Sequence, residues 1–133
     1  ISLHAPNDEI RNQIMPVNKK WNVEALMKAA NDYFDATSRR VSFEYILIDG
    51  LNDSIENAEE LVRLLQGRPY HVNLIPLNNI KERNFKRSRE EQVLKFQQIL
   101  RQSGINATVR RELGSDIKAA CGQLRRQENE KEI

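Results

Sequence analysis

Several polar residues stand directly after stretches with the pattern of β-strands, and they are the best candidates for chemistry. In α/β barrels and open parallel sheets, ligands bind at the carboxy ends of the strands. Polar groups gathered at such an edge supply the hydrogen bonds that orient a ligand. The candidate set comprises Ser2, His4, Asp49, Asn52, Asp53 and residues 73–79, among them Asn78.

Each candidate also has a purely structural interpretation. A lone histidine such as His4 is common in turns, and acid–base chemistry by its ring is the alternative. Asn52, Asp53 and Ser54 are typical of a turn followed by a helix cap. Asn78 is also typical of a loop. The sequence leaves both interpretations open at these positions.

A metal site within this chain is not predicted. Asp49 and Asp53 form a carboxylate pair, but no third ligand accompanies them. With one cysteine and two histidines, the chain cannot by itself ligate a zinc ion or an iron–sulfur cluster.

The single cysteine, Cys121, lies between small residues in the segment AACGQL at 119–124. A lone cysteine is commonly a small buried hydrophobe. The alternative is an accessible thiolate nucleophile, which the nearby cations Lys118 and Arg125 would support. Composition does not decide between the two. A single cysteine forms no internal disulfide and is typical of a reducing compartment.

The elements that must position these residues alternate between strands and helices. Residues 41–49, 71–77 and 106–111 have the β-branched and apolar patterns of strands. They begin about 30 and 35 residues apart, which is typical of βαβ units with right-handed crossovers. The pattern predicts an α/β fold with parallel strands.

Helices are predicted between the strands and before them. Apolar residues recur at helical spacing over 54–66 and 88–103, where Ser88 and Glu91 have the spacing of a capping box. Asn22 is the expected cap of a helix that runs to Phe34, and residues 7–15 form another short helix. Both later helices are expected on one face of the sheet.

The first four residues have the pattern of the end of a strand. A sheet with only this partial strand and three full ones would leave a long apolar edge uncovered. We therefore expect a partial (β/α) barrel that is part of a larger one. Self-association through the edge, or a rearranged amino-terminal segment, is expected to cover it.

The composition is that of an ordinary soluble globular protein, with 39% apolar and 30% charged residues. No apolar run approaches the ~20 residues of a membrane span and no signal peptide is evident, so a cytoplasmic location is expected. The net charge is +2 and the pI is near 8.8. Cations gather at 81–89 and at the pairs 110–111 and 125–126, which solvated loops would also explain.

Four segments together resemble the family of radical S-adenosylmethionine methyltransferases that modify adenine in 23S rRNA and tRNA. They occur in the family's order and cover nearly the whole chain. The segments are SLHAPND at 2–8, FEYILIDGLND at 43–53, VNLIPLN at 72–78 and GSDIKAACGQL at 114–124. The resemblance is to the carboxy-terminal half of the catalytic barrel of this class and the segment that follows it.

The resemblance implies the following site and partners. Ser2, Leu3, His4 and Asn78 match positions that contact S-adenosylmethionine, and Cys121 matches the cysteine that carries a methyl group. The cofactors are S-adenosylmethionine and a [4Fe–4S] cluster whose ligands lie outside this chain. The partners are 23S rRNA and tRNA, and no membrane. The chain then divides into barrel at 1–112, methyl-carrying cysteine segment at 113–126 and charged tail at 127–133.

The implied mechanism is radical methylation of adenine C2. The cysteine accepts a methyl group from one S-adenosylmethionine, and a second, cleaved reductively at the cluster, yields a deoxyadenosyl radical. This radical removes a hydrogen atom from the methylated cysteine, whose carbon radical adds to C2. A partner cysteine resolves the adduct. The cofactor supplies the radical chemistry while the protein positions one sulfur.

The chain also departs from the family. The cluster motif, the resolving cysteine, the glycine-glutamate cofactor segment and the accessory domain are absent, so we expect no catalysis by this chain alone. Residues 113–116 read LGSD where members commonly read RGDD. A sibling branch that methylates C8 shares these motifs. A non-catalytic α/β module that binds RNA or has a regulatory role is a further alternative.

Overall fold

The computed structural model describes residues 1–78 and 84–110, and it contains the three predicted strands as one sheet. These are β1 (Ser42–Leu47), β2 (His71–Pro76) and β3 (Asn106–Val109), in the order β1-β2-β3. Both pairings are parallel. The predicted α/β fold with parallel strands is confirmed, and β3 ends at Val109 within the predicted span.

The first residues of the chain extend this sheet beyond β1. Ser2 forms a parallel bridge with Glu44, and the Glu44 N–H donates to the Ile1 carbonyl at 2.7 Å. The residues therefore lie as the end of a fourth strand beside β1, as their pattern predicts. Self-association of this edge stays a prediction.

Within residues 1–78 and 84–110 the helical segments are α1 (Asp8–Ile14), the 3₁₀ helix η1 (Pro16–Lys19), α2 (Val23–Thr37), α3 (Ile55–Leu65) and α4 (Glu90–Gln102). Asn7 and Asn22 cap α1 and α2 through side chains that accept backbone N–H groups. Ser54 caps α3 in a reciprocal capping box with Asn57. These caps explain where the three helices begin. No helix among the described residues is long and apolar enough to cross a membrane.

The predicted capping box at Ser88 is wrong. Helix α4 takes Arg89 as its N-cap, and no side chain caps it. The Ser88 hydroxyl instead donates to the carboxylate of Asp53 at 2.7 Å, in a buried position. A hydrogen bond to a buried carboxylate is stronger than one to a helix N–H, which explains why the hydroxyl turns away from α4.

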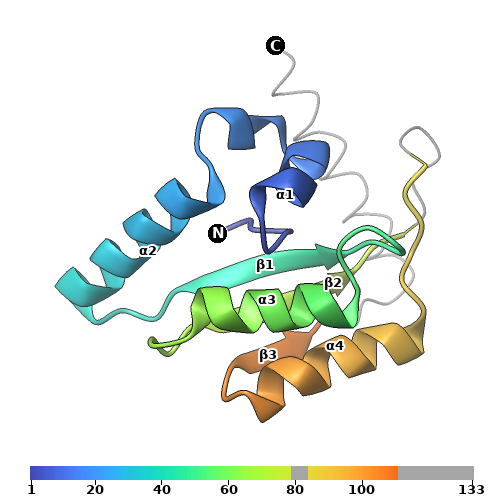
Figure 1. Cartoon of the computed structure of the whole chain (residues 1–133). Helices are drawn as coiled ribbons and strands as arrows, with labels where there is room; N and C mark the ends of the chain where they lie inside the picture. The colour runs from blue at the N-terminus through green and yellow to red at the C-terminus, as the bar shows by residue number, and fades with distance from the viewer. Residues whose placement is uncertain (79–83, 111–133) are drawn as a thin grey trace.

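Helices α3 and α4 lie side by side on one face of the sheet, as predicted (Figure 1). The β1 side chains alternate, so that Phe43, Tyr45 and Leu47 are fully buried toward the helices. Helix α2 contributes three buried residues to the same core. The order of strand, helix and parallel strand is that of a partial (β/α) barrel.

Candidate functional site

Two of the candidate residues lie at the carboxy end of the sheet and a third lies deeper. The His4 ring is bonded to the backbone of Ile46, near the end of β1. Asn78 follows the end of β2 by two residues. Ser2 pairs with Glu44 in the middle of β1 and is half-buried. Contact of these side chains with a cofactor stays a prediction.

His4 is a turn residue in a left-handed conformation. Its φ is 61° and its side chain is 6% exposed. Its Nδ1 accepts the Ile46 N–H at 2.9 Å, in place of the strand carbonyl that a regular ladder would use. An accepting ring nitrogen carries no proton, so the ring is neutral and protonated at Nε2. Nδ1 is therefore no general base while this bond exists, which supports the turn interpretation.

Leu3 belongs to the core. Its side chain is fully buried in the main apolar cluster. Its N–H donates to the Glu44 carbonyl at 2.9 Å, and its own carbonyl accepts from Arg11 Nε at 3.0 Å. The Leu3 side chain packs in the core and its backbone N–H and carbonyl are both hydrogen-bonded. Leu3 therefore helps to hold Ser2 and His4 in position.

Arg11 holds the first strand in place, which sequence analysis missed. The side chain is 4% exposed, and its guanidinium donates to the carbonyls of Ser2 and Leu3 and to Asn18 Oδ1 at 2.9–3.1 Å. Burial lowers the pKa of the Arg11 guanidinium, and the Asp8 carboxylate partly offsets this. A basic residue on a short helix ordinarily faces solvent, so no local signal indicates this role.

Asn52 is a second residue whose role was missed. Its side chain is fully buried and donates to the carbonyls of His4 and Ile46 at 2.8 and 2.7 Å. It accepts the Ile48 N–H at 2.8 Å, and its own carbonyl accepts the Tyr45 hydroxyl at 2.6 Å. The turn interpretation is therefore incomplete, because Asn52 ties the His4 segment to the end of β1.

Asp53 joins the turn after β1 to the start of α4. Besides the Ser88 hydroxyl, its carboxylate accepts the Gly50 N–H at 3.1 Å. Gly50 has a φ of 72°, a conformation that glycine adopts at little cost. Burial, with the charge of Asp53 next in importance, raises the pKa of Tyr45 well above its usual value.

The loop after β2 returns to the end of β1 and carries cations there. The Asp49 N–H donates to the Lys86 carbonyl at 2.8 Å, and Arg87 forms an antiparallel bridge with Ile48. Arg87 Nη1 reaches Asn78 Oδ1 at 3.5 Å. A pocket of about 240 Å³ opens beside this loop, between β2, β3 and α4. The edge that carries His4 and Asn78 is therefore flanked by basic side chains.

Cys121 and the rest of the segment 113–126 lie outside the described residues, as does the tail at 127–133. Among residues 1–78 and 84–110, no group of three potential metal ligands comes together. Three cluster thiolates cannot come from a chain with one cysteine. The residues present therefore do not fit an iron–sulfur cluster.

Curated relatives match almost the whole chain. The chain is 58% identical over 126 residues to a "Probable dual-specificity RNA methyltransferase RlmN" of Caldanaerobacter subterraneus subsp. tengcongensis. It is 52% identical over 132 residues to the protein of that name in Staphylococcus saprophyticus. These alignments cover 95% and 99% of the chain but 37% and 36% of the relatives. The chain therefore spans little more than a third of their length. No family model matches it.

Solved structures agree with the sequence comparison. A crystal structure of a radical SAM methyltransferase from Sphaerobacter thermophilus superposes with a TM-score of 0.85 at 54% identity, over 92% of this chain and 36% of that one. A domain of pyruvate-formate lyase-activating enzyme from Bacteroides vulgatus shares the fold alone, with a TM-score of 0.66 at 19% identity. It covers 84% of this chain and 65% of that one.

Relatives of this kind imply S-adenosylmethionine and an iron–sulfur cluster in general terms. The chain is thus similar in sequence to one part of proteins named dual-specificity RNA methyltransferase RlmN, and in sequence and fold to one part of a radical SAM methyltransferase, which confirms the resemblance that its motifs indicate.

Proposed function

We propose that this chain is part of a radical S-adenosylmethionine enzyme that methylates C2 of an adenine in 23S rRNA and tRNA. The observation that carries the proposal is the identity above 50% to RlmN proteins, over almost the whole chain. The names of these relatives specify a dual-specificity RNA methyltransferase. C2 is chosen over C8 because it is the commoner type in the family, since the C8-methylating branch shares the same motifs. We attribute the methyltransferase activity to a longer polypeptide that includes this chain.

In this proposal the carboxy edge of the sheet holds S-adenosylmethionine. His4 and Asn78 offer an imidazole and an amide near that edge, and Ser2 offers a hydroxyl deeper along β1. Polar groups of this kind suit a nucleoside with an amino-acid tail. Leu3 contributes by fixing the backbone between Ser2 and His4. The proposal gains support from Arg11 and Asn52, whose side chains donate to the backbone carbonyls of Ser2 and His4 and so help to position this segment.

Cys121 is proposed to carry the methyl group on its sulfur. Cofactor and cluster together supply the methyl group and the radical when they are bound, and the cluster ligands come from outside this chain. Gly114 and Gly122 suit a segment that must reach both the cofactor and the base.

The test is methyl transfer from labelled S-adenosylmethionine to RNA by the intact enzyme that includes this chain. Cys121→Ala is expected to abolish transfer. Cys121→Ser is expected to do so as well, because a hydroxyl is a far poorer nucleophile than a thiolate. The cluster absorbance and cofactor binding of both variants serve as controls and should be unchanged. Transfer near the unaltered rate would show that Cys121 is only a small core residue.

The same assay decides between this proposal and its alternatives. Analysis of the methylated nucleoside distinguishes 2-methyladenosine from 8-methyladenosine, and the second product would assign the chain to the C8-methylating branch. RNA binding without any methylation by the unaltered protein would favour a binding or regulatory module.

A further inference from the structure

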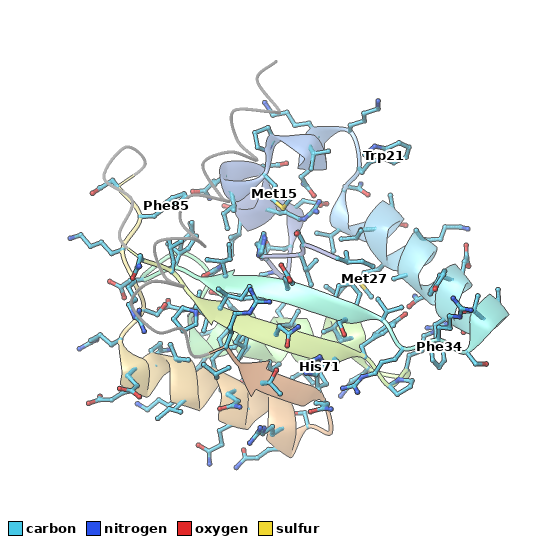
Figure 2. The ribbon with its side chains drawn as sticks, turned by 180° about the vertical axis from the view of Figure 1, so that it is seen from behind. Met15, Trp21, Met27, Phe34, His71 and Phe85 are labelled. Atoms are coloured by element: carbon cyan, nitrogen blue, oxygen red, sulfur yellow. The ribbon has the colours of Figure 1, made fainter. Side chains whose placement is uncertain are left out.

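An exposed aromatic side chain lies beside two lysines on the loop between η1 and α2. Trp21 is 57% exposed, the largest exposed fraction among the described large apolar side chains. Lys20 Nζ lies 5.9 Å from the centre of the indole ring, and Lys19 is also exposed. Figure 2 shows the Trp21 side chain at the outside of this loop, away from the sheet. We call Lys19, Lys20 and Trp21 the basic-aromatic loop.

The backbone of the basic-aromatic loop is rigid although its side chains face solvent. The Trp21 carbonyl accepts from the buried Arg11 at 3.0 Å, and the Trp21 N–H donates to the Val17 carbonyl at 2.9 Å. Asp8 accepts the N–H of Val23, just after the loop, at 2.8 Å. A rigid loop with an outward indole is preorganised for a contact, because little order must be gained on binding.

The core does not account for this indole. Trp21 does not belong to the main apolar cluster of the described residues. The Lys20 ammonium lies over its indole ring. An exposed aromatic ring beside two cations has the composition of surfaces that stack nucleic-acid bases and contact phosphates. The adjoining cations indicate a partner with negative charge and flat apolar groups.

The basic-aromatic loop belongs to the connection that leaves the first strand, and Arg11 joins its Trp21 carbonyl to the carbonyl of Ser2. Residues 5–22 connect the first strand to α2, so they form a βα connection, and such connections meet at the carboxy ends of parallel strands. His4 and Asn78 mark the same end.

We propose that the basic-aromatic loop binds unpaired RNA, with a base stacked on Trp21 and phosphates beside Lys19 and Lys20. Stacking on aromatic rings together with phosphate contacts is how proteins bind single-stranded nucleic acid. The choice of RNA rests on the function proposed above. Exposed, hydrated ammonium groups favour phosphates over an apolar protein surface, because charged residues are depleted from the cores of protein interfaces.

The experiment uses the fluorescence of Trp21, which is the only tryptophan of the chain. We expect quenching to saturate when the 133-residue chain is titrated with a short unstructured RNA that contains adenine. With Trp21→Ala, polarisation of the same RNA carrying a fluorophore should show about 10-fold weaker binding, the scale of a lost base stack. Trp21→Phe should restore most of the affinity.

The double variant Lys19→Ala/Lys20→Ala tests the phosphate contacts. The slope of log Kobs against log salt should become shallower by about 1.4, since each phosphate contact to a single strand contributes about 0.7. Tyr33→Ala and Lys28→Ala are matched controls, because both residues are exposed further along α2. These controls should leave binding within about 2-fold of the unaltered chain, as surface changes outside a contact usually do.

Three outcomes would overturn the proposal. These are RNA binding without quenching, equal loss in the Tyr33 and Lys28 controls, and no RNA binding at low salt. Weaker binding to the same sequence in DNA would support RNA specificity, and binding of a protein partner alone would contradict the choice of RNA. Failure of the proposed function is distinct, since it appears as no methylation by the unaltered intact enzyme.

Discussion

The two faces of the sheet differ in how their side chains are satisfied. On the face toward α3 and α4, Phe43, Tyr45 and Val72 are fully buried among apolar neighbours. On the opposite face, Glu44 and His71 are polar and partly exposed, although they come from the same strands. Figure 2 shows the His71 side chain over the strands on this face. One period-two pattern thus produces an apolar face and a polar one.

The polar face is held by hydrogen bonds between its own side chains. The Thr108 hydroxyl donates its only hydrogen to Asn73 Oδ1 at 2.8 Å, so the His71 Nε2–H must donate to Thr108 at 3.1 Å. Arg110 reaches across β2 to Glu44 at 3.4 Å. In a (β/α) barrel this face lines the interior, and its polarity suits a site for a polar ligand. The comparison shows that the apolar face supplies the core of the fold, while the polar face carries side chains that hydrogen-bond to one another.

The largest effect is expected from the apolar face. Phe43→Ala removes a fully buried ring that lies 5.1 Å from the ring of Tyr70, edge to face. We expect a loss of about 3–5 kcal/mol in the free energy of unfolding, measured by urea titration. The neighbour Ser42 points to the polar face, and Ser42→Ala should change stability by less than about 0.5 kcal/mol. Similar losses for both variants would refute the division between the faces.

Asn52 tests whether a buried polar group is as important as an apolar one. Asn52→Ala leaves the carbonyls of His4 and Ile46 and the Ile48 N–H without this partner. We expect the free energy of unfolding to fall by about 2–4 kcal/mol. Each unpaired buried group costs about 1–3 kcal/mol, and water hydrogen-bonds to some of the three groups in the variant. Asn52→Asp should not restore stability, because a carboxylate cannot donate to the two carbonyls. A stable alanine variant would contradict the anchoring role.

The ion pair on the polar face should contribute little. Glu44 and Arg110 are both roughly 40% exposed or more, and exposed pairs of this kind contribute about 0.2–1 kcal/mol. Glu44→Gln should lower the free energy of unfolding by this small amount at low salt, and the difference should vanish in 1 M salt, roughly the concentration at which such charges are screened. A loss that persists in high salt would indicate packing by Glu44, and would weaken the contrast between the faces.

The smallest effect concerns pH and His71. Burial, followed by repulsion from Arg40, lowers the pKa of the His71 imidazole below its usual value of 6.5. As the pH falls, His71 is therefore protonated in the unfolded chain before it is protonated in the folded chain. The stability that His71 contributes is fully present above pH 6.5 and is lost as the pH drops through the pKa of His71 in the folded state. His71→Gln should make the urea midpoint fall less steeply below that pH. Since His4 is unchanged in both proteins, equal slopes would contradict the assignment.

Local sequence patterns were enough to predict most of the fold. The strands at 42–47, 71–76 and 106–109 and the caps Asn22 and Ser54 follow from period and propensity within a few residues. His4 and Asn78 could be placed near one edge because parallel strands end together. The one local pattern that failed, at Ser88, did so because Asp53 competes for the hydroxyl from 35 residues away.

The sequence by itself determined the order of strands and helices, the apolar face and the family resemblance, because each is written in residues near one another along the chain. Only the tertiary structure decided the anchoring roles of Arg11 and Asn52 and the exposed position of Trp21. The carbonyl that Asn52 binds at His4 is 48 residues away, and no local pattern encodes that separation. The role of a buried polar side chain depends on which groups lie within hydrogen-bonding distance of it. The direction in which an exposed side chain points depends on how the tertiary structure holds its backbone.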